Sequence, residues 1–139
     1  MKVLFDTNIV LDVLLNRQAF VEHSAKLMGL VESQRIEGYL CATTLTTLDN
    51  LTAKSQGREK AKIQIKKLIT LFQIAPVNHL VLNLALDAGF KDFEDSVQYH
   101  CAKCSNVEIL VTRNTKDYKK ATLPIYTPEE LLNVLQGLS

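Results

Sequence analysis

Residues 3–10, VLFDTNIV, place an acidic side chain directly after an apolar run. A short apolar run is typical of a strand buried in a parallel sheet, and the Ile, Val and Leu residues that follow indicate a helix. Asp6 therefore stands where a strand turns into a helix. Because ligands of open parallel sheets bind beyond the carboxyl ends of the strands, we expect Asp6 to point into a binding site.

The rest of the chain alternates short apolar segments with longer segments of helical periodicity. Strands are predicted over residues 2–5, 38–41, 73–75, 109–112 and 123–127. Helices are predicted after Asp6 to residue 15 and over residues 19–33, 43–54, 58–72, 79–88, 93–103 and 128–137. Strands that alternate with helices form a parallel sheet covered by helices on both faces, so the fold class is α/β.

Length and composition indicate one globular unit and name no partner. With 139 residues, 47% of them hydrophobic, and a formal charge of +1, we expect residues 1–139 to form a single domain. No segment approaches the roughly 20 apolar residues of a membrane span. An odd number of cysteines fits a reducing compartment, so we expect a cytoplasmic protein whose Cys41, Cys101 and Cys104 are buried, unreactive thiols.

A second acidic group, Asp92, Glu94 and Asp95, lies in the segment FKDFEDSVQYH at the start of a predicted helix. These residues have a structural explanation, because Asp92 suits the N-cap position and negative charge is favourable in the first turn. Alternatively, they belong to the site that Asp6 faces. This stretch alone favours capping.

A third polar group follows the predicted strand 109–112, in the segment LVTRNTKDY. This strand delivers Thr112, Arg113, Asn114 and Asp117 to the same edge of the sheet as Asp6. Asn and Asp also form turns through bonds to their own backbone, which is the structural alternative. The convergence of three groups at one edge favours a functional site.

In three stretches, the sequence resembles the PIN domains, metal-dependent nucleases that include the VapC-type ribonuclease toxins. The stretches are VLFDTNIVLDVLL, DFEDSVQYHCA and ILVTRNTKDY, the last followed by LPIYTPEELL. The resemblance implies a three-layer α/β/α sandwich with a central parallel sheet of four to five strands. It also implies that Mg²⁺ or Mn²⁺ binds to Asp6, Asp95 and Asp117, with Thr7, Asn8, Asp92, Thr112 and Asn114 as auxiliary residues.

The second acid of many PIN domains has no clear counterpart. The closest ungapped match places it at Thr47, whereas the nearest acidic residue is Asp49. Leu48 lies on the core stripe of the predicted helix, and Thr47 and Asp49 lie about 100° to either side of it, so only one of them faces the site easily. Either the helix is shifted so that Asp49 joins the site, or a hydroxyl or water replaces the acid.

The resemblance implies a function: an endoribonuclease that hydrolyses RNA phosphodiester bonds and is the toxin of a toxin–antitoxin pair, with an antitoxin partner and a homodimeric assembly. Arg113 and Lys116 are the predicted contacts to substrate phosphates. A PIN domain that binds RNA or protein without catalysis is the alternative. A phosphatase of the haloacid-dehalogenase type is disfavoured, because Asn8 stands where that family has a second Asp.

Overall fold

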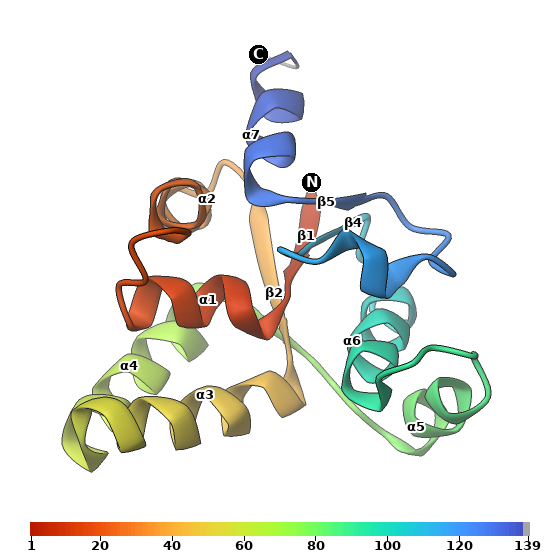
Figure 1. Ribbon diagram of the computed structural model, residues 1–139, viewed down its shortest axis with the longest axis horizontal. Helices are drawn as coiled ribbons and strands as arrows, with labels where there is room; N and C mark the ends of the chain where they lie inside the picture. Colours follow the sequence, from red (N-terminus) through yellow and green to blue (C-terminus); the bar gives the residue numbers. More distant parts are fainter. Residues whose placement is uncertain (138–139) are drawn as a thin grey trace.

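The computed structural model describes residues 1–137 as a central sheet with helices on both faces (Figure 1). The strands are β1 (Lys2–Phe5), β2 (Glu37–Cys41), β3 (Gln73–Ala75), β4 (Ile109–Val111) and β5 (Ile125–Tyr126). The helices are α1 (Thr7–Leu14), α2 (Val21–Glu32), α3 (Ala42–Gln56), α4 (Arg58–Leu71), α5 (His79–Leu86), α6 (Phe93–Cys104) and α7 (Pro128–Gly137), with a 3₁₀ turn η1 (Thr115–Tyr118). The α/β class is confirmed.

The five strands are all parallel and lie in the order β3-β2-β1-β4-β5. The chain runs outward from β1 to β2 and β3, and then returns to place β4 on the other side of β1. Strand order therefore reverses at β1. The carboxyl ends of β1 and β4 flank this reversal, which is where doubly wound sheets bind their ligands.

Alternating side chains of β1 point into two separate cores. Val3 and Phe5 pack with residues of α1–α4 and α7, whereas Leu4 packs with residues of α5, α6 and η1. All three side chains are fully buried, as expected for a strand in the middle of a covered sheet. The predicted three-layer sandwich is thus confirmed, with five strands in its middle layer.

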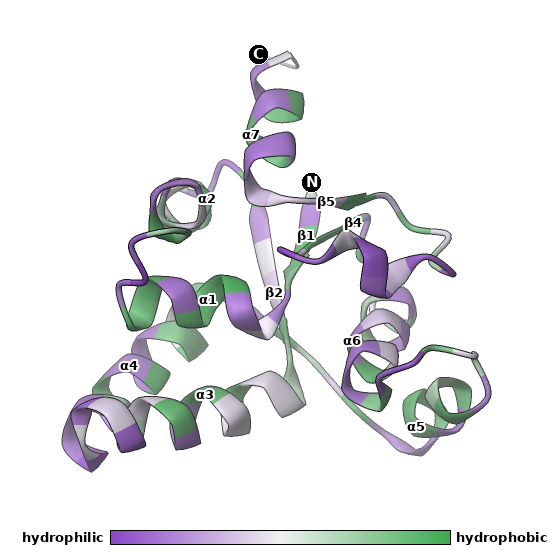
Figure 2. Cartoon of the chain, viewed as in Figure 1, coloured by the Kyte–Doolittle hydropathy of each residue, from purple (hydrophilic) through white to green (hydrophobic). Residues whose placement is uncertain are grey.

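After the fully buried Val3, Leu4 and Phe5, the carboxyl edge of the sheet is the next polar region that the chain reaches. Figure 2 shows the change from hydrophobic to hydrophilic colouring where β1 meets α1. The backbone N–H of Asp6 still pairs with the Val111 carbonyl of β4, at 2.9 Å. Asp6 is therefore fixed at the strand end by the sheet itself.

Differences from the predicted elements are confined to their ends. The last strand is Ile125–Tyr126, shorter than predicted, and α3 runs to Gln56 because Gly57, with a φ of 96°, ends the helix.

Cys41 and Cys101 are buried as predicted, but Cys104 is exposed at the end of α6, so its predicted burial was wrong. None of the helices within residues 1–137 has the length and hydrophobicity needed to cross a membrane.

Candidate active site

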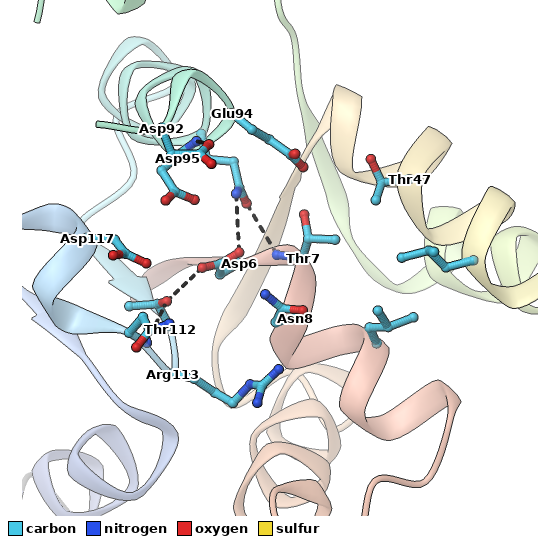
Figure 3. Close-up of a pocket in the computed structure, with 14 residues that line it drawn as sticks. Asp6, Thr7, Asn8, Thr47, Asp92, Glu94, Asp95, Thr112, Arg113 and Asp117 are labelled. Carbon is cyan, nitrogen blue, oxygen red and sulfur yellow. Dashed lines mark hydrogen bonds between the residues drawn. The ribbon is translucent and has the colours of Figure 1, made fainter. Parts of the chain in front are cut away.

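A cavity of about 290 Å³ opens at the carboxyl edge of β1 and β4 (Figure 3). Its lining brings together all three polar groups that the sequence predicted. It is lined by Asp6, Thr7, Asn8, Leu11, Thr47, Leu51, Asp92, Glu94, Asp95, Gln98, Thr112, Arg113, Asn114 and Asp117. Five of these side chains are carboxylates and one is a guanidinium, so the lining is strongly acidic. We call it the acidic cavity.

Asp6 lies at the bottom of the acidic cavity, and its two carboxylate oxygens accept from neutral donors. Thr112 Oγ1 donates to Oδ2 at 2.7 Å, and Gln98 Nε2 donates to Oδ1 at 3.2 Å. The Tyr118 hydroxyl makes a longer contact of 3.4 Å with Oδ2. Asp6 occupies the N-cap position of α1 but forms no side-chain cap bond, so its carboxylate is turned towards the cavity.

Gln98 serves Asp6 and α1 together. Its amide oxygen accepts from the backbone N–H of Thr7 at 3.3 Å and from the Thr44 hydroxyl at 3.4 Å, while its amide nitrogen holds Asp6. The Thr7 N–H is one of the unpaired groups at the start of a helix, and Gln98 satisfies it in place of an N-cap side chain. This buried amide therefore joins α1, α3 and α6 around the carboxylate.

Asp95 lies beside Asp6 and carries the most perturbed carboxyl group of the acidic cavity. Burial, followed by the negative charges of Asp6, Asp92 and Asp117, raises the pKa of Asp95 to about 7. The Tyr118 hydroxyl lies 3.4 Å from Asp95 Oδ1, as it does from Asp6 Oδ2, and so bridges the two acids. Burial and the same two acids raise the pKa of Tyr118, so it remains a neutral donor.

Asp92 is a capping residue, which is one of the two roles predicted for it. Its Oδ1 accepts from the backbone N–H of Asp95 at 3.0 Å, which is the N-cap bond of α6. Asp92 also lines the acidic cavity. The cap therefore fixes the first turn of α6, on which Glu94 and Asp95 stand.

Replacing Asp92 by alanine should lower the free energy of unfolding by about 1 kcal/mol, with or without divalent metal, because an N-cap bond is lost. Thermal melts in EDTA and in Mg²⁺ measure the effect. A loss that appears only in Mg²⁺ would show that Asp92 acts through a metal rather than as a cap.

The loop after β4 forms the wall opposite α1. Asp117 is exposed within η1, and Asn8 and Asn114 also face the cavity. The backbone N–H of Asn114 donates to Thr112 Oγ1 at 3.2 Å, so the hydroxyl that holds Asp6 is itself held in place. Lys116 is exposed on the same turn but does not line the cavity.

Arg113 is anchored behind the cavity by an acid that sequence reasoning did not assign. Asp12 of α1 is fully buried and pairs with Arg113 Nε at 3.0 Å and with Arg17 Nη1 at 3.2 Å. The Arg113 guanidinium also stacks on Phe20, 4.0 Å from the ring centroid. These contacts tie the β4 loop to α1 and hold the one guanidinium of the cavity lining in a fixed place.

The sequence matches the model of the family described as PIN domain over residues 2–116. The chain belongs to the PIN domain family. Ribonuclease VapC1 of Aquifex aeolicus is 24% identical over 134 residues, which cover 93% of this chain and 92% of that protein.

Solved structures share the PIN domain fold. A DNA-bound VapBC complex of Salmonella typhimurium matches with a TM-score of 0.71 at 16% identity, covering 92% of this chain and 98% of the other. VapC20 of Mycobacterium tuberculosis, a toxin that cleaves the sarcin–ricin loop, matches with a TM-score of 0.62 at 14% identity, covering 78% and 86%. These likenesses confirm the predicted architecture.

The structure distinguishes Thr47 from Asp49, the two positions considered for the second acid of this PIN domain. Thr47 lines the cavity and Asp49 does not. Asp49 instead accepts three hydrogen bonds of 2.9–3.0 Å from the Arg58 guanidinium, across the turn at Gly57 between α3 and α4. The possible placement of Asp49 at the metal site was therefore wrong, because this ion pair holds it on the solvated side of α3.

Replacing Asp49 by asparagine should leave Mn²⁺ affinity unchanged, because the carboxylate is directed away from the cavity. We expect a loss of unfolding free energy of no more than about 1 kcal/mol, since the ion pair with Arg58 is partly exposed. Isothermal titration with Mn²⁺ and a thermal melt give both values. Weaker Mn²⁺ binding by Asp49→Asn would contradict this placement.

The donor set of the acidic cavity fits Mg²⁺ or Mn²⁺. These hard cations prefer oxygen ligands, and carboxylates, amides and hydroxyls dominate the lining. Within residues 1–137, neither Asp6, Asp95 nor Asp117 forms a salt bridge, so their charges have no cationic partner in the protein. In that range, no three or more Asp, Glu, His or Cys side chains are already arranged to hold a metal ion.

Sequence reasoning missed Gln98 and Tyr118. Gln98 lies three residues after Asp95, so the spacing alone places these two side chains near one face of α6. Tyr118 follows Asp117 directly, but an apolar ring in a closing turn carries no signal that its hydroxyl bridges two acids. These residues support the acids rather than resembling ligands, and only their tertiary contacts reveal them.

Proposed function

We propose that this PIN domain is a Mg²⁺- or Mn²⁺-dependent endoribonuclease that hydrolyses RNA phosphodiester bonds. The observation that carries the proposal is the convergence of Asp6, Asp95 and Asp117 on one cavity without a cationic partner among residues 1–137. Burial and, after it, repulsion by Asp6, Asp92 and Asp117 raise the pKa of Asp95 to about 7, and a bound cation would offset both effects. The likeness to Ribonuclease VapC1 supports RNA as the substrate.

Asp6 and Asp95 would hold the metal, and Asp117 would complete the set directly or through water. A bound divalent ion polarises the phosphodiester and lowers the pKa of an attacking water. Thr112, Gln98 and Tyr118 keep Asp6 and Asp95 in fixed orientations, so that little side-chain freedom is lost when the ion binds.

Asp117 is the acid best placed to accept a proton from water. It is exposed at the cavity mouth and makes no salt bridge within residues 1–137, so a water can reach its carboxylate. In the proposed hydrolysis, the water oxygen would attack phosphorus while one of its protons passes to the Asp117 carboxylate. The bond to one ribose oxygen would break, and that oxygen would keep the electron pair and take a proton from solvent water. Arg113 at the cavity wall, and Lys116 outside it, would contact the flanking phosphates.

We propose further that the protein is the toxin of a toxin–antitoxin pair and forms a homodimer. The VapBC complex of Salmonella typhimurium, whose fold this chain shares, supports an antitoxin partner. Size-exclusion chromatography with light scattering tests the dimer. If a short reading frame lies directly upstream of the gene, its co-expression with this protein, followed by a growth assay, tests the antitoxin.

An inactive PIN domain that binds RNA or protein is the second candidate. Thr47 favours it, because α3 presents a hydroxyl where many relatives have an acid. Incubation of single-stranded RNA with the protein across a Mn²⁺ titration separates the two functions. Metal-dependent cleavage supports the nuclease, and RNA binding that persists in EDTA without cleavage supports the binding module.

A further inference from the structure

The α3 wall of the acidic cavity carries no acid. It contributes Thr47 and Leu51, and the nearby Asp49 is bound to Arg58. The Thr47 hydroxyl points back to the Thr43 carbonyl of its own helix, at 3.5 Å. One side of the cavity therefore lacks an anionic group from the helix that forms it.

Glu94 reaches this side from α6. Figure 3 shows its side chain extending from the first turn of α6 towards Thr47, on the side of Asp6 away from Asp117. Glu94 lies one residue before Asp95, so the two carboxylates leave α6 in directions about 100° apart. Asp95 faces Tyr118 and the β4 side, whereas Glu94 faces α3.

The Glu94 carboxylate is free to bind. Within residues 1–137 it forms no hydrogen bond and no salt bridge, although the chain has sixteen lysines and arginines. Burial raises the pKa of Glu94, and the charges of Asp92 and Asp6 raise it further, so its carboxylate is electrostatically coupled to the bottom of the cavity. An acid kept only as a favourable first-turn charge would not need to extend over the cavity.

We propose that Glu94 supplies the metal-site carboxylate that α3 lacks, replacing from α6 an acid that Thr47 cannot provide. The inference rests on the proposed metal-dependent activity. It assigns Glu94 to the side of the metal site that α3 lines. Glu94 binds the cation or one of its waters across from Asp117. The anionic set is therefore Asp6, Glu94, Asp95 and Asp117.

Mn²⁺ binding to the purified full chain tests the assignment without an activity assay. Glu94→Gln should weaken Mn²⁺ binding about tenfold, as expected for removal of a ligand or a water-holding acid. Glu59→Gln is the matched control, because Glu59 is also exposed in the first turn of a helix, α4, and lies outside the cavity. It removes the same charge and should leave Mn²⁺ affinity unchanged.

Moving the carboxylate from α6 to α3 tests whether metal binding depends on an acid on this side of the cavity. In the Glu94→Gln background, Thr47→Glu puts an acid back on the same side of the cavity from α3, and Mn²⁺ affinity should recover to within about threefold of wild type. Isothermal titration and Mn²⁺ electron paramagnetic resonance measure the affinities. Equal affinities in Glu94→Gln and Glu59→Gln would overturn the inference, as would a double variant no tighter than Glu94→Gln.

Asp6→Asn separates this inference from the function on which it rests. If Asp6→Asn loses Mn²⁺ binding while Glu94→Gln keeps it, the metal site stands and the role of Glu94 fails. If both variants bind Mn²⁺ as tightly as wild type, the cavity is not the metal site, and the proposed function fails with the inference.

Discussion

Replacing Asp6 by asparagine should reduce metal-dependent cleavage of single-stranded RNA by about a thousandfold or more. Asp6 is the acid at the bottom of the cavity, and asparagine keeps its shape but removes a hard anionic ligand. The loss of several kcal/mol of charge stabilisation in the transition state corresponds to a change of this size. Cleavage rates on a labelled RNA, measured with Mn²⁺ and with EDTA, give the effect.

The control must show whether Asp6→Asn loses activity because the site is altered or because the protein unfolds. Asp6 accepts from three donors and is 7% exposed, so an amide in its place leaves one donor facing another and costs some stability. Circular dichroism melts set the assay temperature below the transition of the variant. Glu59→Gln, a surface change of the same charge, should cleave at the wild-type rate. Undiminished cleavage by folded Asp6→Asn, or by wild type in EDTA, would refute the proposed mechanism.

Replacing Asp95 by asparagine should keep or raise the stability of the metal-free protein and should reduce the stabilisation by Mg²⁺. In EDTA at pH 8, the variant should be as stable as wild type or more stable, because it removes a partly buried charge and its repulsion by Asp6, Asp92 and Asp117. Added Mg²⁺ should stabilise wild type by about 2.7 kcal/mol at 100 times its Kd, and the variant far less. Thermal melts of both proteins, with and without Mg²⁺, measure the difference.

The pH dependence follows from the raised pKa of Asp95. The carboxyl group has a pKa of about 7 in the folded protein and its usual value of 3.8 when unfolded, so between these values the folded state binds more protons. The metal-free protein should therefore lose stability as pH rises from about 4 to about 7. Asp95→Asn should lose less over that interval. A wild-type stability that rises across it, with no Mg²⁺ response at pH 8, would mean that Asp95 does not belong to a crowded anionic site.

Much of the fold could be predicted because local pattern and burial agree. Val3, Leu4 and Phe5 form a run that is typical of a strand buried on both faces, and all three are fully buried. The acids at the strand ends could also be predicted, since parallel strands deliver their carboxyl ends to one edge. Asp6 and Asp117 are both found in the cavity lining.

The supporting residues could not be predicted, because their roles depend on partners far along the chain. Gln98 looks like an ordinary helical polar residue until Thr7 and Asp6 are placed against it. Asp49 and Thr47 could not be separated by helical periodicity, because both flank the core stripe. The Arg58 ion pair decided between them, and it depends on how α3 and α4 fold back on each other at Gly57.

The hydrogen bonds around Asp6 also bear on when the protein can become active during its synthesis. Asp6 is translated well before its partners Gln98, Thr112 and Tyr118, which lie 92, 106 and 112 residues later. The central strand β1 likewise lacks its neighbour β4 until residue 111 is translated. A nascent chain therefore exposes Asp6 long before it can orient this carboxylate, and the site can assemble only after Tyr118 has been translated.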